Sequence, residues 1–359
     1  MTIVDSGSKD LAAEMFSETP NLVVEQFTTP SKVKGPWSQS DMQRHLQWAV
    51  NVEHYTIMYY MSAWFSIKDQ GCEAARLLKS IVNQEMAHMQ SAANLANAFG
   101  TVLHIQPPLY GQSIPHLDFT LDDPDPTRIF TPYSTAIGPF DLRRLNTMCI
   151  IEFPEWSPEP HDHGDSEVYG SIGELYGAII DNIAHLAPTI IGNNQQVDHF
   201  GRFYPKVDMK VTEDGEAARR QVDGLIDLIV FQGEGRSRRE DGVPARFQNA
   251  VDDIRPAADH YDKFTYLREQ PLPETWELAA GDAAGKRAQS ALLQHYGHLV
   301  EHMNYMFGKK SDGTRHDKPH GEFGPAMFSV GAAIAACWQH GALPMFSLPL
   351  TKLRPARTN

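Results

Sequence analysis

The sequence predicts an all-α protein built around a four-helix bundle with a buried metal site. Apolar residues recur at three- and four-residue steps through several long segments, which is the spacing of one helix face. Stretches rich in glycine, proline and aspartate separate these segments, as loops between helices do. Glutamate and histidine side chains interrupt the apolar faces. A buried group of this kind is costly unless something binds it, and in a helical bundle a metal ion is the usual partner.

Two long helices begin the predicted bundle after an irregular segment at residues 1–39. The first helix begins at Ser40, and Glu53 lies inside its apolar stripe. The second helix covers residues 72–98, and Gly100 is its stop signal.

Two shorter helices complete the bundle after an excursion at residues 101–165. This excursion is too long for a bundle loop, and we expect it to wrap over the domain with short strands or turns. The third helix covers 167–188 with Glu174 near its start, and the fourth covers 214–233 and is closed by Glu234.

A further helix is predicted near Pro256, which suits a first turn, with Asp252 or Asp253 as its cap and His260 just inside. Two later helices follow, at 285–307 and 325–340. The chain accordingly divides into an irregular segment at 1–39, a metal-binding bundle at 40–280, and C-terminal helices at 281–359 that pack on the bundle.

Six side chains form the candidate metal site. Four carboxylates and two imidazoles are the donor set of a paired-metal site in a four-helix bundle, with a Glu-x-x-His pair one turn apart. Carboxylates can bridge two cations, and neutral imidazole suits iron or manganese. The six candidates, which we expect to be both metal ligands and catalytic residues, are Glu53, Glu85, His88, Glu174, Glu234 and His260.

Each candidate also has an ordinary structural interpretation. Glu53 could border the apolar stripe, and Glu174 could form a capping box with Ser171. Glu234 could mark an exposed turn, although a carboxylate at a helix C-terminus is disfavoured without a cation. His260 could be a core histidine packed on aromatic neighbours. Glu85 and His88 could likewise be a hydrogen-bonded polar pair between helices.

Five segments resemble the ferritin-like domain of the iminophenyl-pyruvate dimer synthase family, which includes the imine-coupling enzymes of violacein and rebeccamycin biosynthesis. They are Val52-Glu-His-Tyr-Thr-Ile-Met-Tyr-Tyr60, Ile81-Val-Asn-Gln-Glu-Met-Ala-His-Met-Gln-Ser-Ala-Ala-Asn-Leu95, Ser171-Ile-Gly-Glu-Leu-Tyr176, Gln232-Gly-Glu-Gly235 and His260-Tyr-Asp-Lys-Phe264.

This resemblance covers about residues 40–270 and implies a ferritin-like bundle with a di-iron site formed by the six candidates. Manganese is the alternative metal, and O2 is the expected co-substrate. The usual di-iron bundle keeps its second Glu and His one turn apart, whereas a loop separates Glu234 from His260 in this chain. We therefore expect any departure from an ordinary di-iron centre at this second pair.

The expected function is that of a non-haem di-iron oxidase or oxygenase, an oxidoreductase of secondary metabolism and antibiotic biosynthesis. Its substrate would be small and amino-acid-derived. A ferritin-like binding or storage protein without an organic substrate is the alternative, and a scaffold without metal is another. The pattern His298-Leu-Val-Glu301-His302 also matches an inverted zinc-peptidase motif, although the pattern is short. Glu152, beside Pro154, could contact a ligand or lie in a packed turn.

Composition limits the partners. A formal net charge of -14 argues against nucleic acid and anionic membranes. The charged residues leave no apolar window long enough for a bilayer span, and the N-terminus does not resemble a signal peptide. Three cysteines without paired spacing indicate neither disulfides nor a thiolate metal site, which favours the cytoplasm. The exposed faces of such a bundle suit a homodimer.

Overall fold

The structure is a computed structural model of the 359-residue chain. The residues that it describes are 33, 35–114, 116–154, 168–233, 242–248, 252–279, 282–308 and 323–347.

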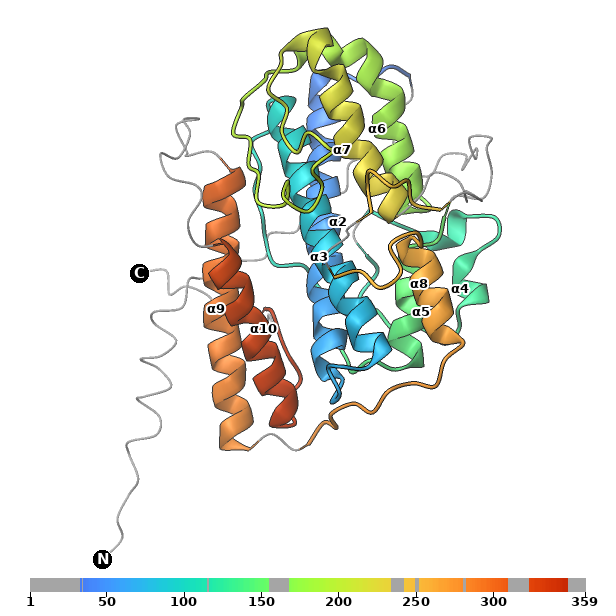
Figure 1. The fold of residues 1–359 in the computed structure, drawn as a ribbon, viewed down its shortest axis with the longest axis vertical. Helices are drawn as coiled ribbons and strands as arrows, with labels where there is room; N and C mark the ends of the chain where they lie inside the picture. Colours follow the sequence, from blue (N-terminus) through green and yellow to red (C-terminus); the bar gives the residue numbers. More distant parts are fainter. Residues whose placement is uncertain are drawn as a thin grey trace, which may run out of the picture.

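Two long antiparallel helices, α2 (Gln39–Ser66) and α3 (Glu73–Ala98), form the centre of the molecule (Figure 1). Ser38 begins α2 through a capping box with Asp41. Gly100 lies just beyond α3 with a φ of +78°, a left-handed conformation in which glycine is favoured. Both predicted long helices are confirmed.

Four shorter helices form a second layer on this pair. The helix α6 (Ile172–Leu186) packs on α2, and α7 (Arg219–Gln232) packs on α3 and α6. The helix α5 (Leu142–Ile151) pairs with α8 (His260–Arg268), which contacts α3. In Figure 1, α6 and α7 lie along the upper part of the long helices, with α5 and α8 below them. The second layer is therefore interrupted midway, where α5 and α7 end and α8 begins.

The excursion at 101–165 differs from the prediction of short strands or turns. Its described part contains a 3-10 turn, η1 (Phe119–Leu121), and the helices α4 (Pro126–Ile129) and α5. The β-type pairing in this described part is one isolated bridge, between Leu117 and Tyr169. Aspartates that suggested loops instead serve as N-caps, because their carboxylates accept the first backbone N–H groups of these helices.

The start of α8 also differs from the prediction. The helix begins at His260, and Asp259 is its N-cap, with a carboxylate that accepts the N–H of Asp262 at 2.8 Å. The chain before it forms turns, so Pro256 is not in a helix. Asp253 does not cap α8, because its carboxylate is held by the ammonium group of Lys263 at 2.8 Å.

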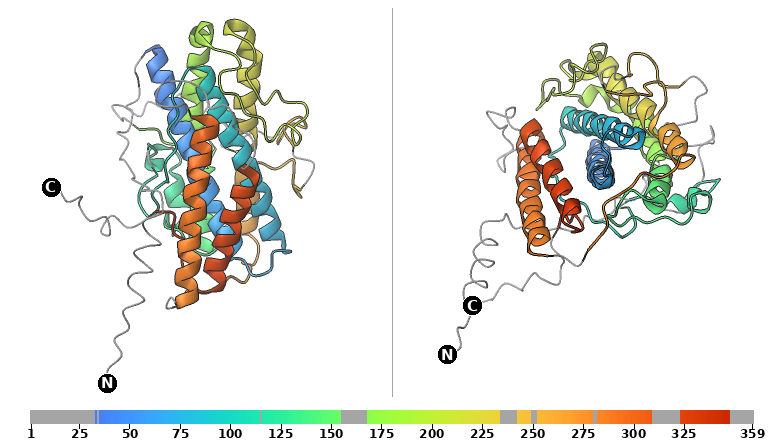
Figure 2. Two further views of the ribbon diagram at one scale, coloured as in Figure 1. Left: turned by 90° about the vertical axis from the view of Figure 1, so that its left-hand side faces the viewer. Right: turned by 60° about the horizontal axis from the view of Figure 1, so that its bottom comes forward.

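The two C-terminal helices, α9 (Ala283–Phe307) and α10 (Phe323–Gln339), form an antiparallel hairpin beside the bundle (Figure 2). The indole N–H of Trp338 donates to the carbonyl of Ser62 on α2 at 2.9 Å. Gly331 faces Phe65, where a Cβ atom would come within 2.9 Å of the ring. The close approach of α10 to α2 therefore requires a glycine. The predicted boundary at 281 lies outside the described residues.

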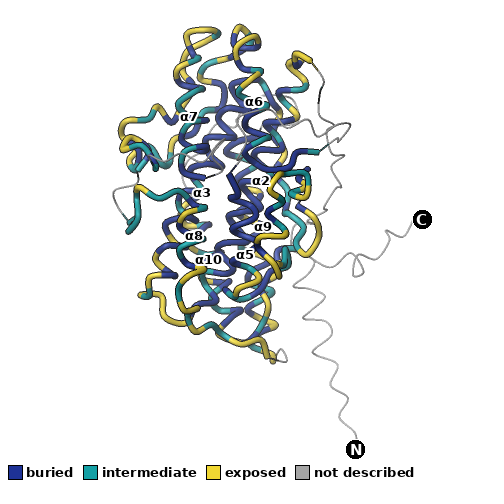
Figure 3. The backbone as a smooth tube through the Cα atoms, turned by 90° about the vertical axis from the view of Figure 1, so that its right-hand side faces the viewer, coloured by how far each residue is buried: buried dark blue, intermediate teal, exposed yellow. Residues whose placement is uncertain are grey.

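Burial follows this arrangement. Figure 3 shows the central helices buried along most of their length, with exposed positions gathered at the helix ends and loops. Within the described part of the chain, no helix combines the length and apolarity of a membrane span.

Candidate metal centre

A cluster of fully buried carboxylates and imidazoles lies midway along α2 and α3. One ligand atom from each of Glu85, His88 and His260 lies within 4.8 Å of the other two. Glu53 joins the cluster, with its Oε2 3.9 Å from Nδ1 of His88. Glu152 joins at the other side, with its Oε2 3.5 Å from Nδ1 of His260. All five side chains have essentially no solvent exposure.

The long helices place three of these residues. Glu53 lies near the middle of α2, and its Oε1 accepts a hydrogen bond from the hydroxyl of Tyr176 on α6 at 2.6 Å. Glu85 and His88 share one face of α3, because residues three apart are neighbours on a helix. Their Oε2 and Nδ1 atoms are 3.6 Å apart. The hydroxyl of Thr56 donates to Oε2 of Glu85 at 3.0 Å, which anchors this carboxylate to α2.

The other two residues of the cluster, Glu152 and His260, lie where the second layer of helices is interrupted. Glu152 directly follows the last residue of α5, and the hydroxyl of Tyr60 donates to its Oε1 at 2.5 Å. His260 is the first residue of α8. A carboxylate at the C-terminal end of a helix faces the negative end of the helix dipole, so Glu152 is held where a cation would be most stabilising.

The orientation of His88 follows from a glutamine at the end of α7. Nε2 of His88 lies 2.9 Å from Oε1 of Gln232. The amide nitrogen of Gln232 donates to the carbonyl of Phe247 and to the hydroxyl of Tyr204, so its oxygen must face the histidine. Nε2 therefore carries a proton, and a neutral His88 presents the lone pair of Nδ1 to the centre.

A second glutamine orients His260 in the same way. Nε2 of His260 lies 3.0 Å from Oε1 of Gln84. The ammonium group of Lys263 also donates to this oxygen, and the amide nitrogen of Gln84 donates to Asp253. Because an ammonium group can only donate, the oxygen of Gln84 is identified unambiguously. Neutral His260 likewise turns Nδ1 toward the carboxylates.

The charges of the cluster are strongly coupled. Burial opposes ionisation of Glu85, but the imidazoles of His260 and His88 outweigh it and hold its pKa below the usual value. Burial and the nearby charge of Glu85 raise the pKa of Glu152. Burial alone would lower the pKa of His260, but Glu85 and Glu152 raise it to about 9. Without a cation, a proton on His260 therefore balances part of the negative charge.

The donor atoms fit a metal ion. Oε1 of Glu85, Nδ1 of His88, Oε2 of Glu152 and Nδ1 of His260 are buried without a hydrogen bond. The closest pair, Oε1 of Glu85 and Nδ1 of His260, is 2.7 Å apart but not aligned for one. Each such atom costs about 1–3 kcal/mol. Two ligands about 2.1 Å from one ion are about 3.0 Å apart at right angles and about 4.2 Å apart when opposite. The closest distances between donor atoms of neighbouring residues in this cluster run from 2.7 to 3.9 Å.

Comparison with known proteins identifies the family to which this helical fold belongs. A sequence model of the ferritin-like family matches residues 46–269. The chain belongs to the ferritin-like family. A solved structure of a ferritin-like protein from Caulobacter vibrioides is 36% identical, with a TM-score of 0.73, and the alignment covers 87% of this chain and 99% of that chain. No curated protein matches the chain. The predicted all-α, ferritin-like fold is confirmed.

The structure brings together four of the six predicted ligands of this ferritin-like chain: Glu53, Glu85, His88 and His260. Glu234 lies outside the described residues. The preceding Gly233 borders the centre, since a Cβ there would lie 3.4 Å from Oε2 of Glu152 and from the ring of His88.

Glu174 has the capping role that was its alternative interpretation. The hydroxyl of Ser171 accepts the N–H of Glu174 at 3.1 Å, and the carboxylate of Glu174 accepts the N–H of Gly170 at 2.6 Å. Tyr176 of the same helix points at Glu53, and residues two apart on a helix are separated by about 200°. The structure therefore directs Glu174 away from the face of α6 that reaches the centre.

Three residues that form or orient the centre were not among the predicted ligands. Glu152 was considered only as a contact to a ligand or a residue of a packed turn, because no helical pattern of acidic and histidine residues surrounds it. Gln84 and Gln232 were not singled out, since a buried glutamine has no distinctive spacing. Gln84 directly precedes Glu85, and this adjacency was the available signal.

The zinc-peptidase pattern does not form a site in the described structure. His298 and Glu301 are exposed on α9, and His302 is half-buried. The group of metal-ligating side chains found among the described residues is the one formed by Glu85, His88 and His260. Direct hydrogen bonds satisfy Glu85 and His88 only in part: Thr56 donates to Oε2 of Glu85 and Gln232 holds Nε2 of His88, but Oε1 of Glu85 and Nδ1 of His88 have no hydrogen bond to another described residue.

Proposed function

We propose that this protein binds iron in the buried centre and uses it with O2 to oxidise a small organic molecule. The observation that supports this most directly is the convergence of two imidazole Nδ1 atoms, each oriented by a glutamine, on shared carboxylates. Bound iron would supply the electrons that reduce O2. The ferritin-like fold supports iron over a lone zinc ion.

The geometry favours two ion positions that share Glu85. Its Oε2 faces His88, which also lies next to Glu53. Its Oε1 faces His260, which also lies next to Glu152. The two rings stack with centroids 5.4 Å apart, and Glu85 lies next to both imidazoles. Glu53, Glu85, His88, Glu152 and His260 would hold the iron, with a histidine and a carboxylate on either side of Glu85.

The other residues hold the carboxylates and exclude water. Tyr176 and Tyr60 each donate to one oxygen of Glu53 and Glu152, which leaves the other oxygen of each carboxylate turned toward an imidazole. Complete burial removes competing water, so the negative carboxylates attract a cation more strongly than they would at the surface.

The proposed substrate is a small, amino-acid-derived compound of natural-product biosynthesis. The motif resemblance to the imine-coupling enzymes supports this narrower part of the proposal. Manganese is the second candidate metal, because carboxylate and imidazole donors suit both ions.

Anaerobic titration with Fe2+ followed by O2 tests the proposal. We expect about two ions per chain and oxidation of both by O2, with loss of binding in Glu85→Ala. His298→Ala is the matched control, since it removes an exposed histidine and should leave binding unchanged. A wild-type chain that binds no iron would contradict the proposal. Uptake of many ions per chain would instead indicate storage, and loss of binding in His298→Ala alone would indicate the peptidase motif.

A further inference from the structure

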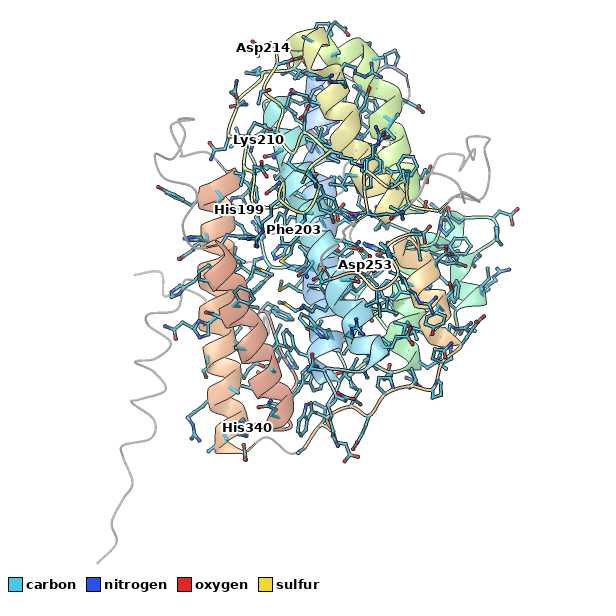
Figure 4. The ribbon with its side chains drawn as sticks, in the orientation of Figure 1. His199, Phe203, Lys210, Asp214, Asp253 and His340 are labelled. Carbon is cyan, nitrogen blue, oxygen red and sulfur yellow. The ribbon has the colours of Figure 1, made fainter. Side chains whose placement is uncertain are left out.

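A cavity lies on the opposite side of α3 from the metal centre. It has a volume of about 500 Å³ and is enclosed by α2, α3, α10 and the segment around residues 199–204. Figure 4 shows His199 and Phe203 of this segment between α3 and the α9–α10 hairpin. None of the proposed metal ligands lines it. Its size is that of a pocket for a small organic molecule.

The walls are aromatic. Trp64 and Phe65 of α2 stack with ring centroids 4.3 Å apart. Phe200 and Phe323 face each other edge-on from the opposite side, with centroids 6.4 Å apart. Flat apolar walls of this kind favour a planar aromatic ligand over a flexible one, because a rigid ring fills them with little loss of conformational entropy.

The rim carries positive charge. Lys79 and Arg202 line the cavity and are exposed, and neither forms an ion pair with another described residue. Arg202 lies over the ring of Phe203, 4.6 Å from its centroid. Asp252 is the acidic residue of the lining, and its carboxylate accepts a hydrogen bond from Asn83 at 2.6 Å. The rim therefore complements a ligand with one acidic group.

A hydrogen-bonded path joins this cavity to the metal centre. Tyr204 lines the cavity, and its hydroxyl accepts from the amide of Gln232 at 3.1 Å. The same glutamine holds Nε2 of His88 at 2.9 Å. Asp252 belongs to the cavity wall, while the adjacent Asp253 holds Gln84. Both glutamines that orient the histidines are thus anchored by residues at or beside the cavity.

From these contacts we infer that the cavity binds a planar aromatic acid and that Tyr204 transmits its occupancy to His88. A ligand that shifts the Tyr204 ring moves the hydroxyl that holds the amide of Gln232. The imidazole of His88 then changes its orientation toward the metal. Binding itself needs no iron, so this inference can fail while the proposed oxidation holds, and the reverse is also true.

Calorimetry with 2-naphthoate on the metal-free full-length chain tests the binding step. We expect 2-naphthoate to bind more tightly than 2-naphthalenemethanol, which has the same ring without the charge. In the Lys79→Gln, Arg202→Gln double variant, the affinity for 2-naphthoate should fall about fivefold, so that the preference for the acid over the alcohol is lost. Equal affinities for the acid and the alcohol in the wild-type chain would overturn the assignment of an acidic ligand.

Two glycine variants locate the ligand. Gly324 lines the cavity with nothing within 4 Å of its Cβ position, so Gly324→Phe adds a ring at the cavity wall whose first atom meets no neighbour. Gly224 of α7 is equally open but lies outside the cavity, which makes Gly224→Phe the matched control. We expect only Gly324→Phe to abolish naphthoate binding. Unchanged naphthoate binding in Gly324→Phe would overturn the inference. Dissociation of a dimer of this chain by Gly324→Phe would also overturn it, because the cavity would then be an interface between two copies.

Co2+ bound to the full-length chain provides a spectroscopic test of the coupling. We expect 2-naphthoate to shift the visible absorption of the bound Co2+ in the wild-type chain. In Tyr204→Phe, naphthoate should still bind by calorimetry, but the shift should disappear, because the hydroxyl that holds Gln232 is gone. A shift of the same size in this variant would overturn the coupling.

Discussion

At the scale of single residues, two glutamine amides decide which nitrogen each histidine presents. Imidazole can carry its proton on either nitrogen, and the hydrogen bond of the outer nitrogen selects the tautomer. Gln232 and Gln84 are themselves held by groups whose donor or acceptor character is fixed, a carbonyl in one case and an ammonium group in the other. In the neutral form, both histidines therefore present the unprotonated Nδ1 toward the carboxylates, where a metal would bind.

Replacement of the Gln232 side-chain amide tests whether the glutamine orients His88. Gln232→Leu should weaken metal binding about 10- to 100-fold, because His88 loses the acceptor that fixes its tautomer and ring orientation. Gln221→Leu is the matched control, since Gln221 is also a largely buried α7 glutamine but contacts Thr212 and the neighbouring loop. Metal affinities from competition with a chelator provide the measurement. Equal losses in the two variants would show a general effect on folding rather than on His88.

At the scale of secondary-structure elements, the helix ends explain why the second ligand pair departs from the regular spacing. The loop between Glu234 and His260 predicted a departure there. The structure places His260 on the first turn of α8 and supplies Glu152 from the end of α5 as its carboxylate neighbour. Helix α7 contributes Gln232, which acts on His88 from outside the ligand set.

The capping role of Glu174 leads to a prediction for α6. Glu174→Ala should lower the free energy of unfolding by about 1 kcal/mol, because the N–H of Gly170, just before the N-cap, loses its carboxylate acceptor. Iron stoichiometry should stay unchanged, whereas Glu53→Ala should reduce it. Denaturant unfolding and metal analysis of the two purified variants provide the comparison. A loss of iron in Glu174→Ala equal to that in Glu53→Ala would restore Glu174 as a ligand.

At the scale of the whole molecule, the metal centre joins helices that are far apart in sequence. The proposed ligands come from α2, α3, the end of α5 and the start of α8, and Tyr176 adds α6. A cation that binds only the folded chain would therefore stabilise the packing of both layers at once.

Metal removal should lower the stability of the entire fold. At a free metal concentration about 100 times the dissociation constant, binding should add about 2.7 kcal/mol to the free energy of unfolding. Thermal unfolding of the chelated and the iron- or manganese-loaded chain, followed by circular dichroism, measures this difference. In Glu85→Ala the metal should no longer raise the midpoint. A midpoint that rises equally in that variant would place the stabilising ion elsewhere.

Several features of this protein follow from its sequence alone. The 3.6-residue periodicity and the caps determined the long helices, because both depend on neighbours within a few positions. The Glu85 and His88 pair followed from the same local geometry. The identity of the fold followed from motifs in a consistent order, and the family match at residues 46–269 agrees with it.

Tertiary structure alone decided the rest of the centre. Glu152 and Gln232 carry no local pattern, and only the meeting of α5, α7 and α8 on the long helices brings them, and Gln84 of α3, to the histidines. The orientation of Glu174 was equally nonlocal, because a Ser-x-x-Glu sequence suits both a cap and a ligand. The packing of α6 on α2 decides between them by turning Tyr176 toward Glu53. Helix formation depends on short-range contacts, whereas a ligand set depends on which faces the packed helices share.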